Sequence, residues 1–310
     1  MLILPTFVAR RERWWLHISL FLLTFVTVAA GGALLQSGER ASGPMSWNLP
    51  GLATFVKQWV MGTLPGVNFA LALMGILLVH ECGHYFLAKR YRINVSPPFF
   101  FPAPYQINFI GTFGALIRLR GPVADRRQLM DVGAAGPWAG FILAVLYFVV
   151  GLTLSVPSHA ANDVGLVINI GTPHLRMGDS LLTYWFRHWR FADAAVLLHP
   201  LALAGWFGMF VTALNLLPLG QLDGGHVLYA LSGRLQAIIS VIVWLALIPL
   251  GHFFWGWWLW AGFIFVISRG RVLHPSVLDR HRRLPVSREV LGWATLVLFA
   301  LTFTPVPIYI

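Results

Sequence analysis

The segment from Leu71 to Lys89 reads LALMGILLVHECGHYFLAK and joins a long apolar run to three ionisable side chains. No Lys, Arg, Asp or Glu occurs in the fifteen residues from Gly66 to His80. A run of this length predicts a helix that lies in a membrane. Ionisable groups inside such a helix are costly, and they normally face a cavity or a partner. The segment therefore restricts the chain to folds that enclose these groups in a functional interior.

His80, Glu81 and His84 have HExxH spacing. Helix positions four residues apart lie on one face, so both histidines can offer a ring nitrogen to a single tetrahedral metal ion. Glu81 is set about 60° around the helix from His84. From there it can reach a water on the metal without ligating the metal, which is the geometry of a general base in a metalloprotease. The alternative, two buried histidines bonded to neighbouring helices, leaves Glu81 without a role.

The composition indicates an integral membrane protein. Hydrophobic residues make up 57% of the 310 residues and charged residues 11%, whereas a soluble domain carries about 25% charged residues. The net charge of +11 does not indicate nucleic-acid binding, because the basic residues lie beside apolar runs and not in a stripe interleaved with aromatics. The single Cys82 excludes an internal disulfide and a cysteine-based metal knuckle.

Apolar segments of about 20 residues predict an all-α polytopic membrane protein with six to seven transmembrane helices. We expect an uncleaved signal anchor first, with a cleaved signal peptide as the alternative, and an interfacial helix near 52–61. The chain divides into an N-terminal span and connection (1–65), a catalytic core (66–232) and C-terminal spans (233–310). The expected spans are about 14–35, 66–89, 137–156, 200–217, 235–250, 253–268 and 289–306.

Two connections and one helix start are also predicted. Residues 95–121 are rich in Pro, Gly and β-branched residues, which favours a small β-hairpin or re-entrant segment near the metal motif over a spanning helix. An edge strand there could pair with an extended substrate peptide, and an ordinary loop is the alternative. Residues 157–199 are expected to be a polar loop with solvated or interfacial histidines. Pro137 fits the first turn of a helix, and Gly136 with Gly140 offers a face for close helix packing.

The sequence NLLPLGQLDGGH (215–226) interrupts the fourth apolar segment. Its Pro and Gly residues break the helix and place Asp223 at the break, where the carboxylate is suited to be a third, oxygen ligand. Asn215 could donate a hydrogen bond to substrate or to a developing oxyanion. The alternative for Asp223 is a turn or capping residue. His226 is a weaker ligand candidate, because the two motif histidines already serve.

Charge predicts the orientation. With the N-terminus in the cytoplasm, seven crossings put 17 of the 22 Lys and Arg residues on one side, as the positive-inside rule requires. The same count brings the end of the second span and the end of the fourth to that side. The count of Lys and Arg residues therefore places the HExxH motif and Asp223 at one depth in the membrane, although neither entered the count.

These residues make the chain resemble the site-2 protease family of intramembrane zinc metalloproteases. The resemblance rests on HECGH (80–84), GTFGALIRL (111–119), AAGPWAG (134–140) and NLLPLGQLDGGH (215–226). The chain is similar to the bacterial and plant-chloroplast branch of the family that lacks a PDZ domain. It implies one zinc ion on His80, His84 and Asp223, with Glu81 as the catalytic base and a substrate role for Asn215. The implied partners are the lipid bilayer and a transmembrane protein substrate that is locally unwound before cleavage.

Two alternatives from other classes are a membrane metal transporter and a non-catalytic membrane scaffold. The transporter requires metal flux and gives Glu81 no role, and the scaffold requires partner binding without proteolysis. The sequence leaves the oligomeric state and the substrate's identity open. A bacterial inner membrane is expected, with a plastid membrane as the alternative, and the active-site end faces the cytoplasm.

Overall fold

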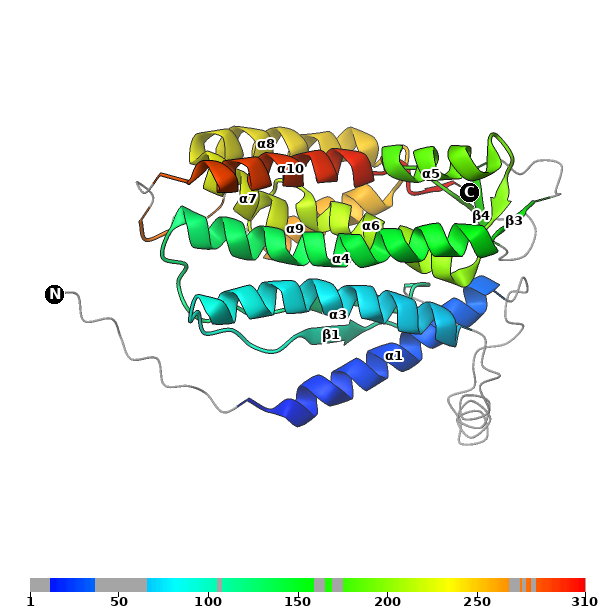
Figure 1. The fold of residues 1–310 in the computed structure, drawn as a ribbon, viewed down its shortest axis with the longest axis horizontal. Helices are drawn as coiled ribbons and strands as arrows, with labels where there is room; N and C mark the ends of the chain where they lie inside the picture. The colour runs from blue at the N-terminus through cyan, green and yellow to red at the C-terminus, as the bar shows by residue number, and fades with distance from the viewer. Residues whose placement is uncertain are drawn as a thin grey trace.

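The computed structural model describes residues 12–36, 66–104, 108–158, 165–168, 175–267, 274, 277–279 and 283–309. The expected interfacial helix near 52–61 and His174 lie outside these ranges. Within them, helices dominate and two small sheets complete the fold (Figure 1).

Each of the seven predicted apolar segments contains a helix, although α4 begins eleven residues earlier than predicted, and α5 and α7 lie outside those segments. Within the described residues, α1, α3, α4 and α8 are long and apolar enough to cross a membrane, while α6 and α9 are apolar but shorter. The protein is therefore an integral membrane protein, and the number of crossings stays a prediction. The bounds are α1 Trp14–Gln36, α3 Val67–Arg90, α4 Arg126–Leu154, α5 Leu181–Phe191, α6 Pro200–Leu216, α7 Asp223–Leu231, α8 Gly233–Leu250, α9 Gly256–Ile267 and α10 Val286–Thr302.

The start of α4 corrects one prediction. The helix begins at Arg126, because the Asp125 side chain caps it by accepting a hydrogen bond from the backbone N–H of Gln128. Pro137 consequently lies in the helix interior and not in the first turn. A proline there removes one backbone hydrogen bond, and the extra turns before it carry α4 past the end of α3 (Figure 1).

A β-hairpin forms where the sequence predicts one. Strands β1 (Phe99–Pro102) and β2 (Thr112–Leu116) pair antiparallel, with Phe100 opposite Ala115. The hairpin is held to α1 by the Thr27 hydroxyl, which donates to the Gly111 carbonyl at 2.7 Å. Its entry into the membrane stays a prediction.

The segment predicted as a polar loop contains regular structure. Strands β3 (Val156–Pro157), β4 (Leu166–Ile168), β5 (Leu175–Met177) and β6 (Val196–Leu197) join the C-terminal β7 (Ile308–Tyr309) in one sheet, ordered β3-β6-β4-β5-β7. Helix α5 begins at a reciprocal capping box between Ser180 and Thr183. The sheet and α5 cover one end of the bundle (Figure 1).

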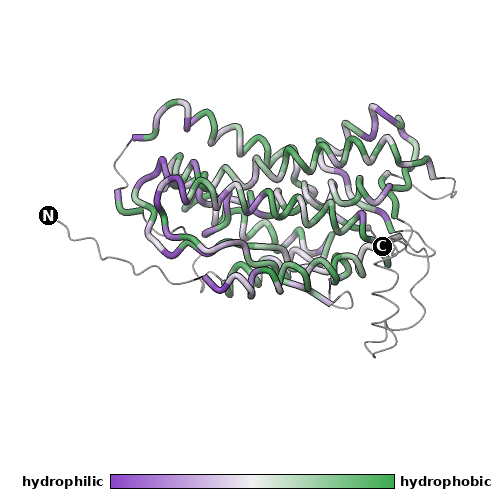
Figure 2. The backbone as a smooth tube through the Cα atoms, turned by 60° about the horizontal axis from the view of Figure 1, so that its bottom comes forward, coloured by the Kyte–Doolittle hydropathy of each residue, from purple (hydrophilic) through white to green (hydrophobic). Residues whose placement is uncertain are grey.

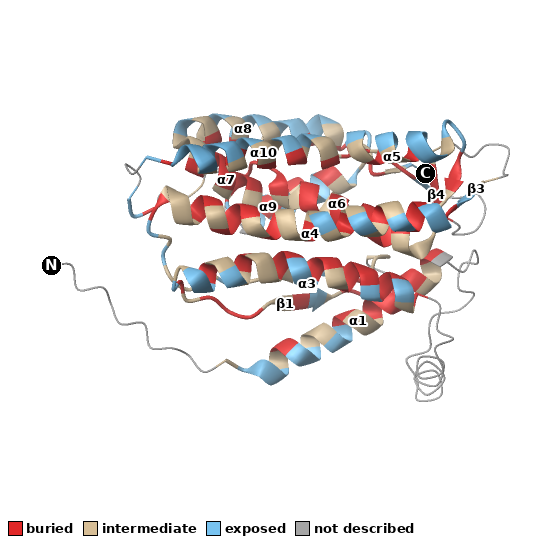
Figure 3. Cartoon of the chain, viewed as in Figure 1, coloured by how far each residue is buried: buried red, intermediate tan, exposed pale blue. Residues whose placement is uncertain are grey.

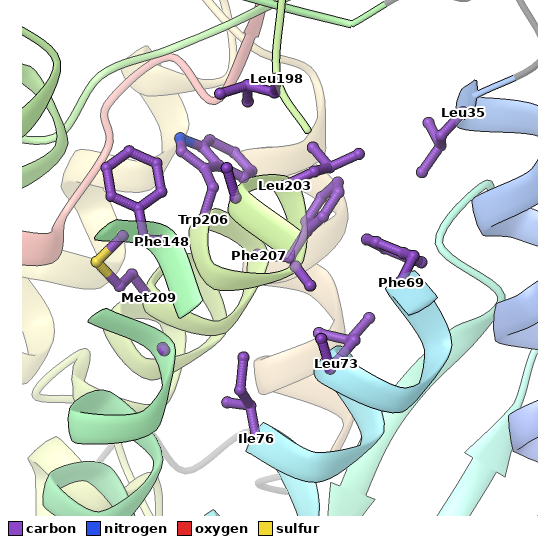
Figure 4. Packing of buried hydrophobic residues seen from close by; sticks show 14 of the residues in the cluster. Leu35, Phe69, Leu73, Ile76, Phe148, Leu198, Leu203, Trp206, Phe207 and Met209 are labelled. Atoms are coloured by element: carbon purple, nitrogen blue, oxygen red, sulfur yellow. The ribbon is translucent and has the colours of Figure 1, made fainter. Parts of the chain in front are cut away.

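The core lies where α3, α4 and α6 meet. Figure 4 shows Phe69 and Leu73 of α3 pointing toward Phe207 of α6, and the two phenyl rings are 6.0 Å apart, edge to face. Hydrophobic residues run along the helices and hydrophilic ones gather toward the ends of the bundle (Figure 2). The outer faces of α8 and α10 are exposed (Figure 3), as expected of surfaces that contact lipid.

Candidate metal centre

Helix α3 carries three ionisable side chains inside the bundle. His80, Glu81 and His84 are buried, with exposed fractions of 4%, 5% and 6%. The two histidines lie one helical turn apart, and the second offers Nε2 to the same point in space as the first. Burial of three such groups in one turn is costly unless they share a ligand.

The geometry of three donor atoms fits a zinc ion. Nε2 of His80 and Nε2 of His84 are 3.2 Å apart. Oδ2 of Asp223 lies 3.3 Å from the first nitrogen and 3.2 Å from the second. Two donors at about 2.0–2.1 Å from a tetrahedral zinc ion are about 3.3 Å apart. The triangle therefore has the dimensions of three zinc ligands, and it forms the metal-binding group of His, Cys, Asp or Glu found in the described part of the chain.

A backbone group of α4 orients His84. Nδ1 of His84 is 2.7 Å from the carbonyl oxygen of Val132. A carbonyl only accepts hydrogen bonds, so Nδ1 carries the proton and Nε2 is left with its lone pair for a metal. This contact could not be read from the sequence, because the Val132 side chain takes no part in it.

Two glycines let α4 approach the histidines. A Cβ atom at Gly136 would lie 2.1 Å from Nε2 of His84, and one at Gly140 would lie 2.9 Å from Cβ of His80. The sequence predicts close packing for these glycines, and the structure confirms it against the rings of the candidate ligands.

Asp223 is positioned by the predicted break. Helix α6 ends at Leu216, because Pro218 lacks an N–H and disfavours helical backbone in the residue before it. The chain then turns through Gly220 at φ +48°, and Asp223 becomes the first residue of α7, where a carboxylate interacts favourably with the helix dipole. Glycine at position 224 allows the start of α7 to pack against the end of α6, since a Cβ atom there would lie 1.9 Å from the Leu216 carbonyl oxygen.

The predicted site residues line one cavity of about 180 Å³. Glu81 faces it beside the donor triangle, and the backbone of Ile117, just after β2, approaches the Glu81 carboxylate. Asn215 reaches it from the last turn of α6, with Nδ2 3.3 Å from Nε2 of His80. Residues Ala115 and Leu116 of β2 form another wall. All five predicted site residues are thus together, brought from α3, α6 and α7.

The cavity also contains a side chain that the sequence analysis set aside. His226 lines it, and Nδ1 of His226 lies 2.7 Å from Nε2 of His274. His226 is not part of the donor triangle, and the sequence analysis ranks it below Asp223 as a ligand. His274 carried no sequence signal, because no motif in the basic segment 269–288 links it to position 226, 48 residues earlier.

The fold and the cavity define a class: a helical membrane protein with two histidines and one aspartate arranged for zinc and an HExxH glutamate beside them. The sequence profile of peptidase family M50 matches residues 68–249, which is more than half of the chain. The chain belongs to this family, as its resemblance to the site-2 proteases predicts.

Curated relatives carry matching descriptions. The chain is 34% identical over 257 residues to "Probable zinc metalloprotease EGY1, chloroplastic" of Arabidopsis thaliana, covering 78% of this chain and 44% of the relative. It is 33% identical over 251 residues to "Probable zinc metalloprotease EGY2, chloroplastic" of the same plant, covering 79% and 42%. The chain thus spans less than half the length of these relatives. No solved structure matches it significantly.

Proposed function

We propose that the protein is an intramembrane zinc endopeptidase that hydrolyses peptide bonds within or near transmembrane segments of other membrane proteins. The observation that carries this proposal is the joint position of the donor triangle and Glu81 in one cavity among apolar helices. A transport or scaffold function would leave Glu81 without a task.

His80, His84 and Asp223 would hold the zinc ion. When bound, zinc would supply Lewis acidity toward a peptide carbonyl and lower the pKa of water. Glu81 takes a proton from the attacking water as the new C–O bond forms, and returns it to the amine nitrogen as the C–N bond breaks. Asn215 donates its amide N–H to the carbonyl oxygen that becomes negative.

Strand β2 would present the substrate to these groups. One edge of β2 pairs with β1, and the sheet adds no further strand to the other edge within the described residues. Unpaired backbone groups at such an edge can pair with an extended peptide. A substrate helix must unwind to do this, because helical peptide groups are shielded by their own hydrogen bonds. Entry of the hairpin into the membrane would bring the edge to the substrate.

We further propose that residues 66–232 form the catalytic core, with six to seven crossings in the whole chain and the metal end in the cytoplasm or its plastid equivalent. The family match over 68–249 supports the extent of the core. The chloroplastic descriptions of the relatives support a plastid membrane, whereas the comparisons lend no support to the expected bacterial inner membrane.

The test uses the full chain purified in detergent, loaded with one equivalent of zinc and mixed with a panel of transmembrane peptides. We expect cleavage by the wild type. Glu81→Gln should bind zinc with wild-type stoichiometry and lose cleavage by at least about 100-fold, because it keeps the shape of the side chain without its basicity. A Glu81→Gln protein that cuts at the wild-type rate would rule out the mechanism.

A further inference from the structure

His226 is the one histidine of the described cavity lining that lies outside the donor triangle. It follows Asp223 by three residues in α7, so the two side chains lie on neighbouring positions of the same helix face. Its Nδ1 atom is engaged by His274 at 2.7 Å. Nε2 is therefore the ring nitrogen of His226 that remains for a hydrogen bond to a molecule in the cavity.

The position of His226 is fixed by its neighbours. A Cβ atom at Gly133 of α4 would lie 2.9 Å from Cβ of His226, so the glycine allows the His226 side chain to pack directly against α4. The ring of Tyr229 stacks on His274, with centroids 4.4 Å apart and planes at 27°. Such packing holds the imidazole pair in one arrangement.

His274 is also tied to the turn that carries Asp223. Its backbone N–H donates to Oε1 of Gln236 at 3.4 Å. Gln236 is buried and donates to Ser240 at 2.8 Å, and Ser240 donates to the Pro218 carbonyl at 2.6 Å. One hydrogen-bonded chain in α8 thus connects the imidazole pair to the break between α6 and α7.

A hydrogen bond between two neutral imidazoles needs one N–H and one bare nitrogen. Two carboxylates, Glu81 and Asp223, border the same cavity as His226. Zinc on the donor triangle would offset this negative charge, so the tautomer of His226 follows from the hydrogen bond between the two rings. If His274 donates from its own Nε2 to Nδ1 of His226, the proton of His226 lies on Nε2, where it can be donated to a molecule in the cavity.

We propose that His226 is a second hydrogen-bond donor to the peptide carbonyl under attack, acting together with Asn215, and that His274 is the positioning residue that fixes its tautomer. The inference rests on the proposed peptidase function and adds to it a residue that recognises the substrate. The ligand class is an extended peptide whose carbonyl oxygen becomes an oxyanion during hydrolysis.

The activity test compares His226→Leu, His226→Gln and His226→Asn in the zinc-loaded full chain. The Gln amide reaches the place of Nε2, and the Asn amide reaches that of Nδ1. Loss of one oxyanion donor costs about 10²–10³ in kcat, so we expect that loss in the Leu and Asn variants at nearly unchanged KM. His226→Gln should keep at least ten times the activity of His226→Leu. His188→Leu, at an exposed histidine of α5, is the matched control and should behave as the wild type.

A second measurement needs no turnover. The ¹⁵N spectrum of the zinc-loaded protein should show His226 with its proton on Nε2, and His274→Leu should abolish this preference. His274→Gln, which keeps a donor, should restore part of it together with kcat.

Three results would overturn the inference. One is wild-type kcat in His226→Leu, the second is loss of zinc in that variant, which would make His226 a structural support, and the third is a proton on Nδ1. A wild-type protein that cleaves no peptide would overturn the proposed function, and this role for His226 with it. Cleavage that is unaffected by His226→Leu would overturn only the present inference.

Discussion

Replacing Gly136 by alanine tests whether the contact between α4 and α3 controls metal binding. The new Cβ would lie 2.1 Å from Nε2 of His84, whereas ordinary contacts of a Cβ atom begin at 3.4 Å. Either the imidazole or α4 must therefore move by about 1.3 Å, while zinc–ligand distances tolerate a change of about 0.2 Å. Disturbing a supporting residue alone costs about 10–100-fold in metal affinity. Displacing His84 itself should cost at least about 100-fold, equivalent to about 2.7 kcal/mol.

The assay is a zinc titration of the purified chain against a competing chelator, with peptide cleavage measured in parallel. Gly75→Ala in α3 is the matched control. A Cβ there would have Tyr147 Oη at 3.9 Å as its nearest neighbour, so this variant should bind zinc normally and gain about 0.5–1 kcal/mol in stability from the better helix former. Wild-type zinc affinity in Gly136→Ala would refute the argument, because it would show that α4 does not set the position of His84.

Three further predictions concern the other elements of the site. Asp223→Asn should weaken zinc binding at least about 100-fold through loss of the anionic ligand, and a normal zinc titration would contradict this. Gly111→Ala should displace the hairpin, because Gly111 has φ +87° and a Cβ there would lie 2.2 Å from the Thr27 carbonyl oxygen. Cleavage should fall while zinc is retained, and Gly262→Ala, which meets no atom within 4 Å, should leave both unchanged. Asp125→Ala removes the cap of α4 and should lower the free energy of unfolding by about 1 kcal/mol, and denaturant unfolding with an unchanged midpoint would count against the cap.

The candidate metal ligands could be predicted from the sequence, because their spacing along the chain and a helix break determine where their side chains lie. HExxH spacing placed two imidazoles on one helix face, and a proline–glycine break placed Asp223 at a helix start. The charge count brought these two remote segments to one level of the membrane. The structure places the donor atoms of His80 and His84 3.3 and 3.2 Å from Asp223, as the motif spacing and the helix break predict. The seven crossings behind the charge count stay a prediction.

The small sheet, the start of α4 and the role of His274 could not be predicted, because the sequence patterns that would indicate them are too short, are masked by charge or depend on tertiary contacts. Strands β3 to β7 are two or three residues long, which is too short for a period of two to appear. The first turns of α4 contain Arg126 and Arg127, so hydropathy placed the helix start too late, whereas the cap at Asp125 sets it. His274 meets His226 only through tertiary folding.

The glycines show why packing and chemistry cannot be separated in this protein. In a membrane, helices associate largely through close contact between small residues, because lipid tails provide little hydrophobic driving force between them. Gly136 and Gly140 form such a contact, and the side chains that pack against them are those of His84 and His80. The same approach brings the carbonyl of Val132 to Nδ1 of His84. The contact that joins α3 to α4 therefore also selects the histidine nitrogen that faces a metal, so a substitution that loosens the bundle at this point should be detected first as a loss of zinc.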